Sequence, residues 1–221
     1  MRCGIAIAVG VLLAASDLRA EEALGFVPPA PGTYKLQHIL ASPRGTVLDM
    51  DGNAKPFSRF ATGKITVLSL IYTRCSDGRG CPMASYLLKG LKARIDHERG
   101  LSEQLRFVSL SFDPDNDTPK VMREYAELYA PEKGGVPWYF LTTRSHRELA
   151  PLLDGLGQDV WIAQAGAEGG PLPHLLKVFL LDASGSVREI YTTSFLQPQV
   201  VLNDIKTLLL EEGTRTARAA R

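Results

Sequence analysis

The chain has 221 residues, of which 45% are hydrophobic and 22% are charged, and its formal net charge is +1. This length and composition describe one ordinary globular domain with extensions, and they exclude a disordered or fibrous chain. The near-neutral charge provides no field that would attract nucleic acid or an anionic membrane, so we expect no nucleic-acid partner.

The N-terminus has the pattern of a secretory signal peptide over residues 1–20. Arg2 supplies a positive charge, and the apolar stretch Cys3–Ala15 follows it. That stretch is too short for a comfortable transmembrane helix, so we expect export with cleavage after Ala20. An uncleaved membrane anchor stays open, because Leu18 is imperfect near the cleavage site. We therefore expect an exported, periplasmic protein whose mature domain is not inserted in the membrane.

The first predicted elements of the mature chain are a lead-in, a hairpin and a buried strand. Segment 21–44 is rich in proline, glycine and alanine, and we expect it to be extended without a core of its own. Apolar residues in Thr46–Met50 and Ala54–Phe57 flank the pair Asp51-Gly52, which predicts a β-hairpin with a tight turn. Ile65–Tyr72 is almost continuously apolar and predicts a central strand.

A glycine-rich loop then carries the thiols Cys75 and Cys81 between this strand and a helix. Pro82 suits a first helical position, and apolar residues follow at helical spacing: Met83, Leu87, Leu88, Leu91 and Ile95. The dipole at a helix start favours a thiolate, and Arg74 and Arg79 add positive charge nearby. Thiolates attack disulfides and bind soft metals, so this loop is predicted to carry electrons, a metal ion, or both.

Two further buried strands are predicted at Leu105–Phe112 and Trp138–Leu141, with a helix between them. The loop before that helix, Asp113–Pro119, contains three aspartates, and Thr118 suits the N-cap position. Aspartates in this number could hold a hard cation. The neighbouring prolines and the helix start explain Asp113, Asp115 and Asp117 better as turn and cap residues.

The last part of the chain is predicted to contain a hairpin between two helices. Ser145 and Glu148 form a capping-box pattern that opens the first helix. The strands Leu175–Leu181 and Val187–Thr192 flank a turn, and Pro198–Leu210 closes the domain.

Together these elements predict one α/β domain over residues 45–211, followed by a frayed tail at 212–221. Right-handed crossovers would give a mixed central sheet flanked by helices. This is the thioredoxin-like fold with an added N-terminal β-hairpin.

Three motifs together resemble those of the Sco/SenC proteins, and the resemblance runs from about residue 45 to residue 210. They are the loop YTRCSDGRGCP, the loop SFDPDNDTP before a helix, and a histidine directly before the strand HLLKVFLLD. Members of this family are copper chaperones, periplasmic or mitochondrial, for the binuclear copper centre of cytochrome c oxidase. The resemblance implies copper ligands at Cys75, Cys81 and His174, a copper-receiving oxidase subunit as partner, and a thiol reductant.

The spacing of the cysteines departs from the family, because five residues separate them here where the family usually has three. Gly78 and Gly80 permit unusual backbone angles, so the extra residues could loop out and leave the sulfurs in place. They could equally spoil the copper geometry and leave only a dithiol. Asp77 matches an acidic position of the family's loop and could tune the thiolates or be an ordinary solvated residue.

Two thiolates and one imidazole form a soft three-ligand site that suits Cu(I) and can accept Cu(II), whereas zinc normally takes a fourth ligand. The leading hypothesis is a periplasmic metallochaperone that binds copper through Cys75, Cys81 and His174. The alternative is a thiol–disulfide oxidoreductase with a redox-active Cys75–Cys81 pair that reduces a partner's cysteines before metal insertion. Whether the protein is an enzyme therefore stays open. A peroxidase and a purely structural disulfide are less favoured readings.

The remaining candidates have simpler explanations. His38, His97 and His146 have polar neighbours and are expected at the surface. Met83 could offer a thioether to Cu(I), but it falls on the apolar stripe of its helix, so we expect it to pack in the core.

Overall fold

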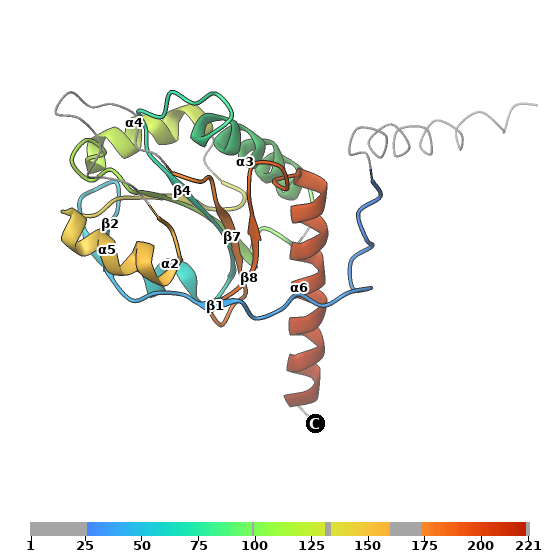
Figure 1. The fold of residues 1–221 in the computed structure, drawn as a ribbon. Helices are drawn as coiled ribbons and strands as arrows, with labels where there is room; N and C mark the ends of the chain where they lie inside the picture. The colour runs from blue at the N-terminus through green and yellow to red at the C-terminus, as the bar shows by residue number, and fades with distance from the viewer. Residues whose placement is uncertain (1–25, 99, 131–133, 160–173, 220–221) are drawn as a thin grey trace, which may run out of the picture.

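The computed structural model describes residues 26–98, 100–130, 134–159 and 174–219 (Figure 1). The predicted signal peptide at residues 1–20 lies outside the described residues, and so does most of the glycine-rich segment before His174. Within the described ranges, no helix is both long enough and apolar enough to cross a membrane.

The domain is built on a six-stranded mixed sheet with the strand order β1-β8-β7-β4-β5-β6. Its strands are β1 (Leu40–Ala41), β4 (Ile65–Ile71), β5 (Leu105–Ser111), β6 (Trp138–Leu141), β7 (Val178–Leu181) and β8 (Ser186–Tyr191). Strands β4, β5 and β6 are parallel, whereas β7 is antiparallel to β4 and β8 is antiparallel to β7. The predicted mixed sheet is therefore confirmed.

Helices cover both faces of this sheet. They are α2 (Ser58–Ala61), α3 (Cys81–Asp96), α4 (Pro119–Tyr129), α5 (His146–Gly155) and α6 (Pro198–Ala219). Figure 1 shows α3, α4 and α6 on one face and α2 and α5 on the other. Every residue of β4 and of β5 is buried, because strands covered on both faces have no solvent side. This explains their continuous apolar sequences.

The predicted N-terminal hairpin is present as β2 (Thr46–Leu48) and β3 (Ala54–Pro56). It forms a separate two-stranded sheet, which an isolated bridge between Leu48 and Thr142 links to the segment after β6. The turn is stabilised by Asp49, whose carboxylate accepts hydrogen bonds from the backbone N–H groups of Asp51 and Asn53.

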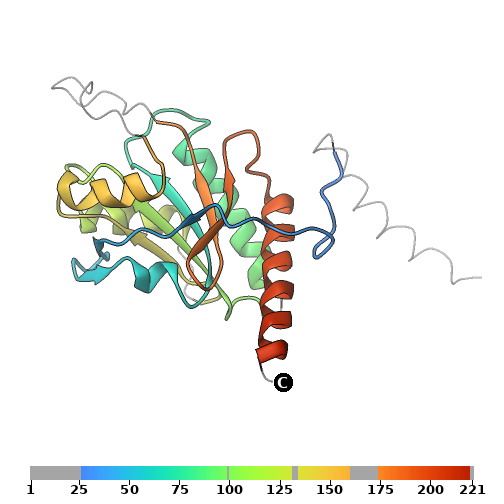
Figure 2. The same cartoon turned by 60° about the horizontal axis from the view of Figure 1, so that its bottom comes forward.

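The lead-in, described from residue 26 to residue 44, is bound to the domain by strand pairing and by hydrogen bonds. Leu40–Ala41 forms β1 and pairs with β8, which makes it an edge strand. The buried guanidinium of Arg188 donates hydrogen bonds to the backbone oxygens of Leu36 and Gln37. Figure 2 shows this lead-in lying across β8 and α6, where the Asn203 amide donates to the Pro29 carbonyl at 2.9 Å.

Two boundaries differ from the sequence-based expectation. Strand β7 begins at Val178, three positions after the expected Leu175, because residues 175–177 lie outside the regular ladder. Helix α6 continues to Ala219, into the segment at 212–221 that we expected to fray.

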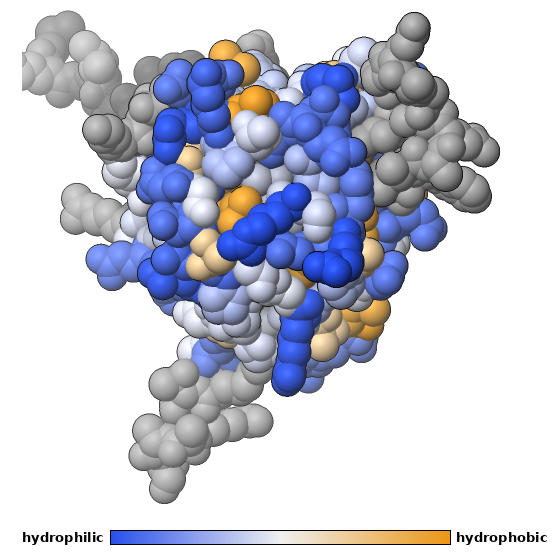
Figure 3. Space-filling model, turned by 90° about the vertical axis from the view of Figure 1, so that its left-hand side faces the viewer, coloured by the Kyte–Doolittle hydropathy of each residue, from blue (hydrophilic) through white to orange (hydrophobic). Residues whose placement is uncertain are grey.

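On the face seen in Figure 3, the described hydrophobic residues form only small scattered groups among hydrophilic ones.

Candidate metal centre

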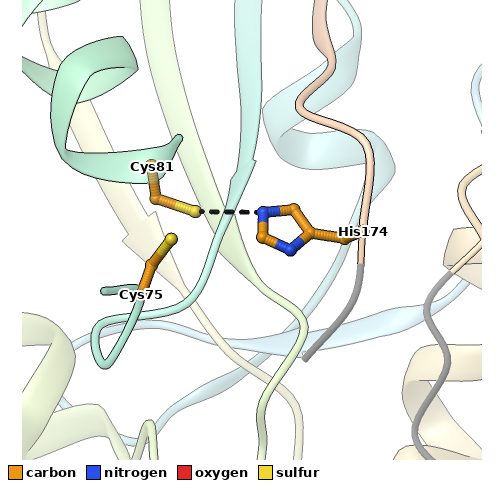
Figure 4. Close-up of side chains that lie close together, drawn as sticks. All are labelled: Cys75, Cys81 and His174. Atoms are coloured by element: carbon orange, nitrogen blue, oxygen red, sulfur yellow. Dashed lines mark hydrogen bonds between the residues drawn. The ribbon is translucent and has the colours of Figure 1, made fainter. Parts of the chain in front are cut away.

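The fold brings Cys75, Cys81 and His174 to one place (Figure 4). Cys75 lies in the loop after β4, and Cys81 is the first residue of α3. His174 precedes β7, which is the neighbour of β4 in the sheet. The sulfur atoms and a ring nitrogen all lie within 4.8 Å of one another, and Cys81 Sγ is 3.6 Å from His174 Nε2. This distance is short enough for a single ion to contact all three after small side-chain movements.

A tight turn absorbs the unusual spacing of the cysteines. The carbonyl of Asp77 accepts a hydrogen bond from the Gly80 N–H at 2.9 Å, and the Asp77 carboxylate accepts one from the Arg79 N–H. A Cβ atom at Gly80 would lie only 3.2 Å from Cys75 Sγ, so glycine leaves room for that sulfur. The extra residues therefore loop out, and the sulfurs remain close together.

The imidazole of His174 is oriented by two aromatic rings. Its centroid lies 4.9 Å from that of Phe112 and 5.4 Å from that of Tyr72, and the Tyr72 contact is edge-to-face with an interplanar angle of 86°. Phe112 follows β5 and Tyr72 follows β4, so two neighbouring strand ends form this wall. Packing of this kind restricts the ring and points one nitrogen at Cys81.

The loop between β4 and α3, which carries Cys75, is also held by the carboxylate of Asp117. This carboxylate is fully buried and accepts hydrogen bonds from the Thr73 N–H at 3.1 Å, the Thr73 hydroxyl at 2.5 Å and the Ser111 hydroxyl at 2.5 Å. Asp117 therefore fixes the backbone two residues before Cys75. The sequence pattern indicates only a turn or cap role for Asp117, because its partner Thr73 is 44 positions away.

The remaining residues of the loop Asp113–Pro119 cap a helix or form ion pairs. Thr118 caps α4 by accepting from the Val121 N–H, as predicted. The Asp115 carboxylate pairs with the ring of His146, and the Asp113 carboxylate pairs with the guanidinium of Arg74 at 3.3 Å. Arg74 is thus held by a carboxylate.

The thiol of Cys81 does not have the lowered pKa that a helix start suggests. Both cysteines are free thiols, and the Cys81 side chain is fully buried. Burial raises the pKa of the Cys81 thiol well above its usual value, and the nearby Cys75 raises it further. The expectation of a thiolate at Cys81 in the metal-free protein is therefore wrong, because desolvation outweighs the helix start. A metal ion that binds here must displace the Cys81 proton.

This pKa shift predicts slow alkylation of Cys81 by iodoacetamide. Near neutral pH we expect the rate to be at least about 10-fold below that of the same thiol in the urea-unfolded chain, which corresponds to one pKa unit. The measurement is peptide mass spectrometry over a pH series. Since burial also limits access, the deciding observation is the pH profile. A rate that still rises above about pH 9 supports the raised pKa, and a plateau near pH 7 contradicts it.

The expectation that Met83 packs in the core is also wrong. Its side chain is 41% exposed, because the buried face of α3 is formed by other positions: Cys81, Ala84, Ser85, Leu88, Leu91, Lys92 and Ile95. His38 and His97 are exposed as predicted, and His146 is half-buried. Asp77 is exposed in its turn.

The SCO1/SenC family model matches residues 46–210. A search of curated proteins returns no significant match. Among solved structures, Arabidopsis thaliana ScoI with copper bound is similar with a TM-score of 0.65 and 18% identity, covering 77% of this chain and 99% of that one.

Two further structures show the same likeness. A SCO1/SenC family lipoprotein from Bacillus anthracis has a TM-score of 0.63 and 22% identity, covering 83% of this chain and 99% of that one. BsSco, described with a disulfide switch as a member of the Sco family of cytochrome c oxidase assembly proteins, has a TM-score of 0.59 and 19% identity, covering 79% and 98%. These likenesses confirm the predicted thioredoxin-like fold.

Proposed function

The chain belongs to the SCO1/SenC family, and from that premise we propose that it binds copper and delivers it to a copper enzyme such as cytochrome c oxidase. The observation that carries this proposal is the convergence of Cys75, Cys81 and His174 within 4.8 Å. The copper bound to the similar Arabidopsis ScoI supports the cargo, and the description of BsSco as an oxidase assembly protein supports the recipient.

The donor set matches this cargo. Two sulfurs and one imidazole nitrogen are soft or intermediate ligands, which suit Cu(I) and can accept Cu(II). Both thiols must lose their protons when copper binds, so loading releases protons. Delivery then proceeds by exchange of ligands with the partner. His174 is half-buried whereas both cysteines are buried, so exchange begins most easily at the imidazole.

We place this activity in the periplasm, after export directed by residues 1–20. The domain is then either released by cleavage or held at the membrane by an uncleaved N-terminus. The similar Bacillus anthracis protein is a lipoprotein, which supports membrane attachment as an arrangement used by a relative.

The proximity of the two sulfurs favours a second function, thiol–disulfide exchange. Oxidation of Cys75 and Cys81 to a disulfide would pass two electrons and two protons to a partner disulfide, which becomes a dithiol. The disulfide switch described for BsSco supports this chemistry. Because a disulfide cannot bind copper, a thiol reductant would be needed before each loading.

Metal analysis of the reduced protein tests the proposal. We expect the anaerobically purified, reduced chain to retain one copper ion per molecule, because the three ligands converge on one position. The chain oxidised to its disulfide serves as the control and should bind none. If the reduced chain also binds no copper, the delivery function is refuted and thiol–disulfide exchange is left.

A further inference from the structure

Gln158 lies three residues after the end of α5 and is only 4% exposed, which is rare for an amide side chain. The helix ends in a Schellman motif, in which the Gly157 N–H donates to the Asp154 carbonyl and the Gln158 N–H donates to the Leu153 carbonyl. Gly157 has the positive φ of +59° that this motif requires. The residue at the position of Gln158 is usually apolar, so a buried amide there calls for a reason.

Hydrogen bonds to backbone carbonyls supply that reason. The Gln158 Nε2 group donates to the carbonyl of Leu175 and to that of Asp159, each at 3.1 Å. Leu175 is the residue after His174. A second contact at the same place joins the Lys177 ammonium to the Gly157 carbonyl. The residues that follow α5 therefore form hydrogen bonds with the segment that carries the imidazole.

The sheet and the core also contact this segment, since His174 forms a β-bridge and Leu176 is only 5% exposed. Strand β7 begins at Val178, and before it the Leu70 N–H reaches the Lys177 carbonyl at a long 3.5 Å. The side chain of Leu175 is 58% exposed and contributes little packing. Between His174 and Leu176, the amide of Gln158 holds the Leu175 carbonyl through its hydrogen bond.

We propose that Gln158 is a positioning residue, which holds His174 over Cys81 through its hydrogen bond to the Leu175 carbonyl. The inference rests on the proposed function in that His174 acts there as a copper ligand. The side-chain hydrogen bonds of Gln158 go to the backbone carbonyls of Leu175 and Asp159, so it acts through the backbone next to the imidazole.

The variant Gln158→Met tests this proposal, since methionine has a similar size and no amide. Without copper, we expect loss of the nuclear Overhauser contacts between the His174 ring and the rings of Tyr72 and Phe112. With Cu(I), we expect affinity about 10- to 100-fold below wild type, the usual effect of losing a partner that orients a metal ligand. In a His174→Ala background the same substitution should change affinity no further.

The matched control is Asn203→Leu. Asn203 is another buried amide, 8% exposed, and it lies on α6. Its side chain donates to the backbone carbonyl of Pro29. Its loss should lower thermal stability without changing the ring contacts or the copper affinity. Should Gln158→Met fail to fold, Gln158→Asn takes its place, because its amide is one methylene too short to reach Leu175.

Two results overturn the proposal. One is a Gln158 variant that keeps the ring contacts of His174. The other is a variant that weakens copper binding equally with and without His174. If wild type binds no copper, the proposed function fails, while the ring contacts of the metal-free protein still decide whether Gln158 positions the imidazole.

Discussion

Replacing Cys81 with serine is expected to lower Cu(I) affinity by more than about 100-fold, because loss of a direct ligand should exceed the 10- to 100-fold effect of losing a residue that only orients one. Serine has nearly the same size and keeps the start of α3, so the fold should persist. The hydroxyl is a hard, protonated donor that Cu(I) does not favour. Competition with a Cu(I) chelator of known affinity measures the change.

Met83→Leu is the matched control for this experiment. Met83 lies two residues after Cys81 and carries the nearest sulfur in the sequence, but its side chain is 41% exposed and packs outside the core. Its replacement should leave copper affinity at the wild-type value. If Cys81→Ser binds copper as wild type does, the thiol pair is not the site. If Met83→Leu weakens binding comparably, the thioether is a ligand and the three-residue site is incomplete.

Replacing His174 with alanine separates the two candidate functions. We expect copper affinity to fall by at least about 100-fold, again because a direct ligand should matter more than an orienting residue. We expect the free energy of unfolding to change little, because His174 is half-buried and precedes the ladder of β7. The Cys75–Cys81 pair should still form a disulfide, since the loop after β4 and the start of α3 position the two sulfurs.

The comparison variant is His146→Ala, which removes a histidine that pairs with Asp115. It should bind copper as wild type does. Copper titration and redox titration of both variants give the answer. Unchanged copper affinity in His174→Ala would exclude the three-ligand site and favour a dithiol that only exchanges electrons.

Features that depend on a few neighbouring residues are predicted correctly from the sequence. Tight-turn chemistry at Asp51-Gly52, the N-cap at Thr118 and the apolar run of β4 each depend on a few neighbouring residues, and each prediction is confirmed. The errors concern exposure. The apolar period of α3 placed Met83 in the core, and the helix start placed a thiolate at Cys81, yet the packing around α3 leaves Met83 in solvent and buries Cys81.

The sequence by itself determined the order of the elements and the fold class, because these follow from periodicity and capping signals that are local in the chain. The three candidate ligands were implied by the resemblance of short local motifs to those of the Sco/SenC family. Only the tertiary structure decided that the longer thiol loop keeps the sulfurs together, and which residues hold the ligands. Asp117 reaches Thr73 across 44 positions, and Gln158 reaches Leu175 across 17. Hydrogen bonds between such distant residues leave no periodic trace, since they exist only once neighbouring strands and helix ends are packed together.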